Sequence, residues 1–205
     1  MSRRRAWLVV MLKEPRPGRV KTRLGHEIGP VAAAWWFRHQ TAALLRRIDD
    51  PRWQLVLAVS PDRAGLSSRV WPAHLPRIAQ GHGDLGDRMG RILRVMPPGP
   101  VCIIGGDIPT LDKPHVARAF AALGAHDAVF GPASDGGFWL VGMKRVARPP
   151  ATLFRGVRWS SPHALADSIA SLPGLRIARA DRLRDVDTAA DLGGGSGARG
   201  GSEGL

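Results

Sequence analysis

The chain has 205 residues, 44% of them hydrophobic, which is long enough for one domain with a full core and too short to favour two. Its formal net charge of +13 comes mostly from arginine and is spread along the chain, without a run of five like charges. Because aromatic and basic residues do not interleave either, the sequence argues against nucleic acid as the main partner. The single cysteine, Cys102, excludes a disulfide framework and a cysteine zinc site, and we expect it to be buried.

Short apolar runs alternate with helix-period segments along the chain, a pattern typical of parallel strands joined by crossover helices. The sequence therefore predicts an α/β fold of three layers, α/β/α, with a mostly parallel central sheet. In chain order, we expect strands at 6–11, 54–59, 77–79, 101–104, 128–130, 138–141 and 175–178. We expect helices from 29–30 to 48 and at 86–95, 114–123 and 162–171.

The first expected helix begins at Gly29-Pro30, a pair that suits a helix start. Its buried face is predicted from apolar residues that recur at helical spacing, namely Val31, Trp35, Ala42, Leu45 and Ile48.

Composition also suggests where the folded domain ends and where the protein works. From Gly193 the chain is rich in glycine and serine, so we expect one domain over 1–192 and a disordered tail over 193–205. The first apolar segment stops after seven residues, and no later segment approaches the roughly 18 apolar residues of a membrane span. We expect a cytoplasmic protein with no membrane partner.

A basic loop follows the first expected strand, with the sequence K-E-P-R-P-G-R-V-K-T-R-L over residues 13–24. Two prolines and Gly18 make this segment stiff and tightly bent. It carries five cations, Lys13, Arg16, Arg19, Lys21 and Arg23. The loop lacks the pattern of a Walker A site, so it is either a different kind of polyphosphate-binding segment or a solvated basic turn.

Two groups of carboxylates are candidate metal ligands. Asp107 follows the strand V-C-I-I-G-G, and a carboxylate at the carboxyl end of a central strand suits Mg²⁺. Asp185 and Asp187 lie two apart in L-R-D-V-D-T-A-A-D-L, so in an extended segment they point the same way. The alternatives are a turn or helix-cap role for Asp107 and a cap of the last helix for Asp187.

Two glycine-rich segments complete the set of motifs. Q-G-H-G-D-L-G-D-R-M-G begins a helix whose amino terminus could donate amides to a ligand. G-P-A-S-D-G-G-F-W-L-V-G precedes a strand and is either a hairpin-like turn or a loop that approaches a substrate closely. Metal-binding histidine pairs and a nucleophile elbow are both missing from the sequence, which argues against zinc peptidases and serine hydrolases.

Taken together, these motifs resemble the DUF2064 family of GT-A fold, glycosyltransferase-like proteins, which includes a group associated with arsenosugar biosynthesis. The motifs F-x-G-V-x-W-S-S and L-R-D-V-D-T-x-x-D-L extend the resemblance over residues 6–192. The family is in turn similar to the phospholactate and phosphoenolpyruvate guanylyltransferases and, more remotely, to the molybdenum cofactor guanylyltransferases. The chain departs from the family pattern at Ser134 and Ile108, and in the glycine-rich segment after Leu192.

The resemblance implies a nucleotide-diphospho-sugar transferase fold and a role for each motif. It assigns nucleotide binding to Lys13, Arg19, Lys21, Arg23, Gly83, Asp84 and Arg88, with Lys21, Arg19 and Asp107 as catalytic residues. It assigns a Mg²⁺ or Mn²⁺ ion to Asp107, Asp185 and Asp187. It assigns the acceptor to Asp135, Gly136, Gly137 and Trp159.

Two transferase reactions fit these expectations. In nucleotidyl transfer, a nucleoside triphosphate gives its nucleotidyl group to a small phosphorylated or hydroxylated acceptor and releases pyrophosphate. In glycosyl transfer, a nucleotide sugar gives its sugar and releases a nucleoside diphosphate. Five cations in one loop suit a triphosphate slightly better. A non-catalytic protein that binds nucleotides or nucleic acid is the third reading.

Overall fold

The computed structural model describes residues 5–184, and these form a mixed α/β fold. The strands are β1 (Ala6–Lys13), β2 (Trp53–Ser60), β3 (Arg77–Ala79), β4 (Val101–Gly105), β5 (Ala128–Pro132), β6 (Phe138–Met143) and β7 (Ile177–Arg179). The helices are α1 (Thr22–Ile28), α2 (Pro30–Ile48), α3 (Asp62–Leu66), α4 (Leu85–Val95), α5 (Lys113–Ala125) and α6 (Ala164–Ala170). Every expected strand and helix is present, whereas α1 and α3 were not expected. Asp185, Asp187 and the glycine-rich segment after Leu192 lie outside the described residues.

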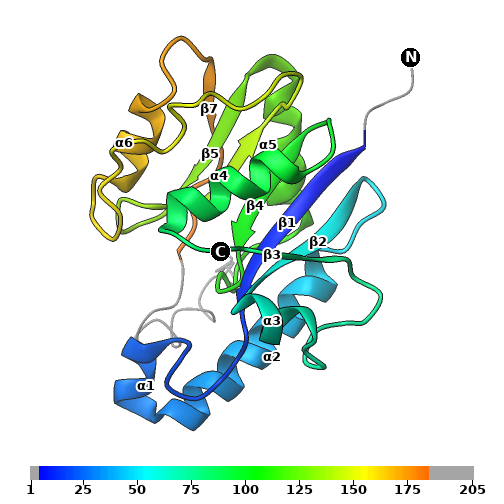
Figure 1. Ribbon diagram of the computed structural model, residues 1–205, viewed down its shortest axis with the longest axis vertical. Helices are drawn as coiled ribbons and strands as arrows, with labels where there is room; N and C mark the ends of the chain where they lie inside the picture. Colours follow the sequence, from blue (N-terminus) through cyan, green and yellow to red (C-terminus); the bar gives the residue numbers. More distant parts are fainter. Residues whose placement is uncertain (1–4, 185–205) are drawn as a thin grey trace, which may run out of the picture.

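Within the described part of the chain, seven strands form one sheet in the order β3-β2-β1-β4-β6-β5-β7 (Figure 1). All neighbouring pairs are parallel except those of β6, which runs antiparallel to both β4 and β5. The expectation of a mostly parallel sheet is therefore confirmed. Because β6 is reversed, its first residue, Phe138, lies at the same edge as the carboxyl end of β4.

The order in which strands are added to the sheet reverses at β1, which pairs with β2 on one side and with β4 on the other. Such a switch point opens a crevice beyond the carboxyl ends of the two strands, where α/β proteins commonly bind ligands. In Figure 1, the loop after β1 and helix α1 lie beyond this end of the sheet. The expected basic loop and Asp107 are therefore carried to one edge.

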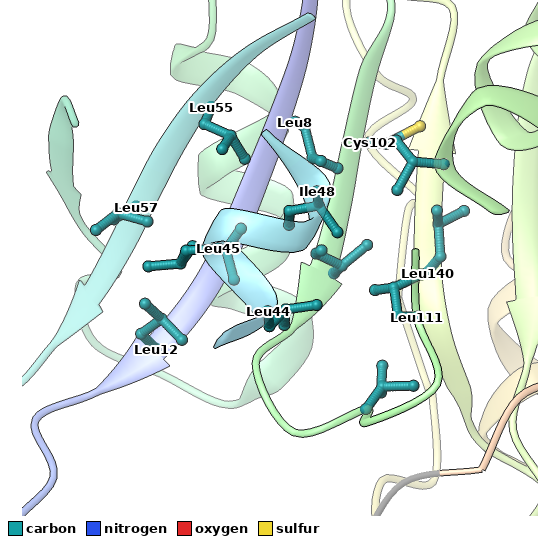
Figure 2. Close-up of a cluster of buried hydrophobic side chains, with 14 of the residues drawn as sticks. Leu8, Leu12, Leu44, Leu45, Ile48, Leu55, Leu57, Cys102, Leu111 and Leu140 are labelled. Atoms are coloured by element: carbon teal, nitrogen blue, oxygen red, sulfur yellow. The ribbon is translucent and has the colours of Figure 1, made fainter. Parts of the chain in front are cut away.

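Alternating residues of β1 divide between two hydrophobic cores, one on each face of the sheet. Leu8 and Leu12 pack with Leu44 of α2 in a cluster that also includes residues of α5 (Figure 2). Val9 packs instead with Ile92 of α4 in the second cluster. Helices thus cover both faces, which confirms the three-layer architecture. Cys102 is fully buried in the first cluster, as expected.

The expected buried face of α2 was partly wrong. Leu45 and Ile48 are buried, but Val31 and Trp35 are 69% and 63% exposed. The helix instead packs through Ala33, Ala34, Phe37, Thr41, Leu44, Leu45 and Ile48. At its amino end the helix packs against α1, where a Cβ on Gly25 would lie 3.7 Å from Ala33 Cβ, and the bulkier Val31 and Trp35 lie at the surface.

Candidate active site

Buried side chains anchor the basic loop on the hydrophobic core and so orient its charged residues. Val20 is 4% exposed and Leu24 is fully buried, so these two side chains fix the end of the loop on the core. Gly18 has a φ of 71°, and the turn at its position is closed by a hydrogen bond from the Arg19 amide to the Arg16 carbonyl. Glu14 is tied to the neighbouring strand through its amide and the Ser60 carbonyl. These contacts fix the conformation of the loop and place its cations at the crevice.

Lys21 occupies an unusual backbone conformation at the end of this loop. Its φ of 45° and ψ of 51° are left-handed, a region that non-glycine residues other than Asn and Asp seldom adopt. The residue immediately precedes α1, and the following turn is closed by a hydrogen bond from Gly25 N to the Lys21 carbonyl. Such conformations cost about 1–3 kcal/mol and concentrate at functional sites.

The Lys21 side chain reaches Asp107, whose carboxylate oxygen Oδ2 lies 2.6 Å from the Lys21 ammonium nitrogen Nζ. The side chain of Lys21 is only 7% exposed, whereas that of Asp107 is 30% exposed. The ion pair therefore joins the loop after β1 to the loop after β4, and it leaves part of the carboxylate open to solvent.

Two glycines bring the chain past β1 to Asp107. A Cβ on Gly106 would lie 2.3 Å from Leu12 Cδ2, so any larger residue would displace this buried side chain of β1. The Gly106 carbonyl accepts a hydrogen bond from Thr41 Oγ1 at 3.3 Å. Beyond the aspartate, Ile108 is 1% exposed and holds the chain on the core. Asp107 is thus an aspartate of a fixed loop and is not a helix cap.

The segment before α4 forms the far side of the crevice. Asp84 caps α4 in a capping box, with its Oδ1 accepting from Asp87 N at 2.8 Å and its own amide donating to Asp87 Oδ2. Arg88 donates from Nε to the Gly83 carbonyl at 3.0 Å. Gly83 has a φ of 97°. The expected helix start is confirmed. Asp84 and Arg88 each use hydrogen bonds to fix the conformation of this segment.

A cleft of about 640 Å³ lies between these elements, large enough for a drug-sized ligand. All the residues expected to bind the nucleotide line it, namely Lys13, Arg19, Lys21, Arg23, Gly83, Asp84 and Arg88, and so does Asp107. Arg16 is not among the lining residues. Sequence reasoning missed other members of its wall, including Thr22, Phe37, Gln80, Leu85, Met89, Phe138 and Trp139.

A second cavity of about 250 Å³ adjoins the cleft, and Asp107, Phe138 and Trp139 line both. Three of the residues expected to bind the acceptor, Asp135, Gly137 and Trp159, line this second cavity. The fourth, Gly136, does not line it. Gly136 packs so closely against Pro162 that a Cβ on it would lie 2.4 Å from the Pro162 carbonyl oxygen.

The D-G-G segment forms a hairpin turn between β5 and β6, closed by a hydrogen bond from Ala133 N to the Gly137 carbonyl. It also lines the second cavity, so both readings of this segment apply. The side chain of Asp135 accepts from Gly137 N at 2.9 Å.

The wall of the second cavity is partly aromatic and is held by an ion pair. The Trp159 ring lies edge-on to Phe138 and Phe154, with centroids 6.2 and 5.7 Å away. The guanidinium of Arg158 forms two hydrogen bonds with the Asp167 carboxylate, of 2.8 and 2.9 Å. These bonds lower the pKa of Asp167 to about 2.

Among residues 5–184, no group of three His, Cys, Asp or Glu side chains is placed to hold a metal ion. Asp107 is the only one of the three expected metal ligands within this range. One partly exposed carboxylate in a cationic cleft still fits Mg²⁺, which commonly takes one or two protein carboxylates and completes its shell with water and phosphate oxygens.

The sequence pattern of a family described as "uncharacterized protein conserved in bacteria (DUF2064)" matches residues 43–161. Comparison with curated protein sequences found no match. Within residues 5–184, no helix is long and apolar enough to cross a membrane.

Solved structures share this fold. A candidate nucleotide-diphospho-sugar transferase from Desulfovibrio desulfuricans G20 is 27% identical, with a TM-score of 0.77 over 89% of this chain and 82% of its own. A CMP:2-keto-3-deoxy-manno-octonic acid synthetase in complex with CTP is 12% identical, with a TM-score of 0.55 over 92% and 95%. The Rv0371c protein of Mycobacterium tuberculosis H37Rv, in complex with manganese, is 15% identical, with a TM-score of 0.52 over 92% and 96%. The nucleotide-diphospho-sugar transferase fold is therefore confirmed.

Proposed function

Because the chain belongs to the DUF2064 family and has the fold of nucleotide-diphospho-sugar transferases, we propose that it is a metal-dependent transferase with a nucleotide as donor. The observation that carries this proposal is the cleft in which Lys21, on the basic loop, faces Asp107. Cations on one side and a carboxylate on the other suit a polyphosphate with a divalent cation.

In this proposal, Lys13, Arg19, Lys21 and Arg23 hold the phosphates that leave with the donor. Transfer from a nucleotide is mainly a problem of positioning and of neutralising charge, and fixed cations do both without reorganising during the reaction. The anchored loop supplies such cations. A Mg²⁺ or Mn²⁺ ion held by Asp107 would supply further positive charge at the phosphate oxygens, and we propose Asp185 and Asp187 as its other ligands.

The acceptor is proposed to occupy the second cavity, beside Asp135, Gly137 and Trp159, with Gly136 shaping the turn behind them. This cavity meets the cleft at Asp107, so a group bound there lies next to the proposed phosphate site. An acceptor oxygen would then attack from the side opposite the basic loop. The leaving group would depart toward the cations.

We favour nucleotidyl transfer, in which the acceptor oxygen bonds to the α-phosphorus and the bond to the β-phosphate breaks. Four loop cations at the cleft suit a departing pyrophosphate of high charge. Glycosyl transfer is the second candidate, and the name of the Desulfovibrio relative favours it. In that reaction the bond at the sugar carbon breaks and a nucleoside diphosphate leaves.

Product binding separates the two reactions even before the acceptor is known. We expect pyrophosphate to bind in the presence of Mg²⁺ and to compete with nucleoside triphosphates, as measured by calorimetry. If nucleotide sugars and nucleoside diphosphates bind and pyrophosphate does not, glycosyl transfer is correct. Binding that needs no Mg²⁺, falls steeply with salt and survives Asp107→Ala would instead indicate a non-catalytic polyanion-binding protein.

A further inference from the structure

The two adjoining cavities of the candidate site differ in charge. Five cationic residues line the larger cleft, namely Lys13, Arg19, Lys21, Arg23 and Arg88. No lysine, arginine or histidine of residues 5–184 lines the second cavity, and its charged residues in that range are Asp107 and Asp135. The second cavity therefore suits a group whose chemistry differs from that of the phosphates proposed for the cleft.

Basic residues near this cavity do not supply the missing positive charge. The Arg158 guanidinium is paired with the Asp167 carboxylate, at 2.8 and 2.9 Å. Lys21 bonds to Asp107, but it lines only the cleft. The cavity is not lined by three other basic residues that are close to it in the chain, Arg155, His163 and Arg184. A negatively charged group beside Asp135 would thus have no cation from the described part of the chain, and burying an unpaired charge is costly.

The apolar part of the cavity wall consists of aromatic rings in fixed positions. Trp139 is 5% exposed, and its only polar atom, Nε1, donates to the Asp181 carbonyl at 2.8 Å. The Trp159 ring packs so closely on α4 that a Cβ on Gly86 would lie 2.7 Å from its Cζ2. Phe138 lies between the two tryptophans on the list of lining residues in sequence and shares the wall with them. These rings can cover an apolar face of a ligand without having to be reorganised first.

Two polar groups of the cavity are available to a ligand. Asp135 Oδ1 accepts from Gly137 N at 2.9 Å, whereas Oδ2 accepts no hydrogen bond from residues 5–184. The Ser160 hydroxyl also makes no hydrogen bond within that range, and the φ of Ser160 is 55°. This left-handed conformation is uncommon for serine and concentrates at functional sites. A carboxylate oxygen that accepts and a hydroxyl that can donate or accept are suitable partners for the hydroxyl groups of a ligand.

We propose that the acceptor is a small polyhydroxylated molecule without negative charge, of about the size of one sugar ring. This inference rests on the proposed transferase function and names the substrate class of its acceptor cavity. The C–H groups of a sugar ring form an apolar face that can pack on Trp159, while its hydroxyls donate to Asp135. An amino group could replace one of these hydroxyls beside the carboxylate, so the shared chemistry is a hydroxylated ring that carries no anion.

The size of the cavity agrees with a small acceptor. Its volume is about 250 Å³, below the range of about 300–1,000 Å³ that is usual for pockets of drug-sized ligands. In the proposed reaction, one hydroxyl oxygen of the acceptor bonds to the α-phosphorus, or to the sugar carbon in glycosyl transfer. The hydroxyl proton is released to water, and pyrophosphate or a nucleoside diphosphate leaves.

The first test compares matched ligands at the second cavity. Trp159 lines this cavity and not the cleft, so its indole N–H resonance, assigned with Trp159→Phe, reports on the cavity alone. Glucose, mannose and galactose would be titrated beside their 6-phosphates and their 2-amino counterparts. During the titration, Mg²⁺ and the α,β-methylene analogue of the tightest-binding triphosphate occupy the cleft, which keeps the sugar phosphates from its cations.

We expect at least one hexose or amino sugar to shift the Trp159 resonance, and its 6-phosphate to need at least about tenfold higher concentrations. A 6-phosphate that acts at an equal or lower concentration, or no shift with any hexose or amino sugar, would overturn the inference. If no nucleotide binds, the proposed function fails instead. The same titration without nucleotide then still decides whether the cavity rejects the phosphate.

The second test shows whether the charge of Asp135 causes the selection. Asp135→Asn keeps an oxygen for the Gly137 amide and removes the negative charge, so the preference for the unphosphorylated sugar should fall severalfold. The matched control is Asp127→Asn, because Asp127 accepts from Arg176 N and lines neither cavity. That variant should keep the preference of the wild type. An unchanged preference in Asp135→Asn would contradict selection by the charge of the cavity.

Discussion

The ammonium group of Lys21 lies 2.6 Å from the carboxylate of Asp107, although the two residues are 86 positions apart in the chain. The loops after β1 and β4 meet through this pair at the switch point of the sheet. Lys21 sits there in a left-handed conformation that the buried Val20 and Leu24 hold in place. The relationship links the anion-binding side of the proposed site to its metal-binding side.

Replacing Lys21 tests the anion-binding side. We expect Lys21→Met to weaken nucleotide binding by about tenfold to a hundredfold, because one charge-assisted hydrogen bond is worth roughly 1.5–3 kcal/mol. Lys144→Met is the matched control, since Lys144 bonds to the Gly124 carbonyl and does not line the cleft. Calorimetric affinities that are equal for the two variants would contradict the role of Lys21.

A pair of glycines in α4 tests the packing behind the second cavity. A Cβ on Gly86 would lie 2.7 Å from Trp159 Cζ2 and 2.8 Å from Phe154 Cβ, so Gly86→Ala should destabilise the fold by about 1–3 kcal/mol. In Gly90→Ala the atoms nearest to the new methyl belong to the flexible end of Arg94, at 3.2–3.6 Å. Helix propensity should make that variant neutral or more stable by up to about 1 kcal/mol. Urea unfolding of both would measure the contrast, and equal effects would refute it.

Acid should weaken the support of the Trp159 loop. Hydrogen bonds from Arg158 lower the pKa of Asp167 from 3.8 to about 2, so this carboxylate stabilises the native state above pH 4. The contribution is lost as the pH falls toward and through 2. The difference in unfolding free energy between the wild type and Asp167→Asn should therefore shrink between pH 4 and 2. In an Arg158→Gln background the same difference should depend much less on pH, and an unchanged dependence would contradict this account.

The only cysteine should be unreactive until the protein unfolds. Cys102 is fully buried on β4, and burial raises the pKa of its thiol, so the reactive thiolate is scarce at neutral pH. A chromogenic disulfide reagent should modify no thiol in the native protein and one thiol per chain in denaturant. Rapid labelling of the native protein would show that this part of the sheet opens readily.

The strands and most helices could be predicted from the sequence because apolar runs and helical spacing record burial directly. The buried face of α2 could not, since alanines and tryptophans both fit an apolar stripe, and the packing against α1 buries the smaller Ala33 and leaves Trp35 exposed. The helix α1 is short and has a single buried residue, Leu24, so its period is too brief to detect. The reversed direction of β6 leaves no trace in the composition of the strand itself, and only the hairpin reading of the D-G-G segment indicated it.

Only part of the candidate site could be predicted from the sequence. Motifs marked the basic loop and Asp107, but no pattern in one sequence could show that Lys21 and Asp107 touch. Gln80 was missed as part of the cleft wall because it is a single polar residue after the short strand β3, and the glycines and Asp84 of the same motif drew attention instead. Its position on the wall depends on hydrogen bonds to the Leu12 and Ala58 carbonyls, which come from other strands.

The most direct test of the proposed function is calorimetric titration of the full chain with nucleoside triphosphates, with and without Mg²⁺, for the wild type and Asp107→Asn. The substitution keeps the size of the side chain and removes its charge. We predict that the wild type binds at least one triphosphate, that Mg²⁺ tightens this binding, and that Asp107→Asn abolishes the tightening. Absence of binding to any nucleotide, or an unchanged effect of Mg²⁺ in Asp107→Asn, would contradict the proposal.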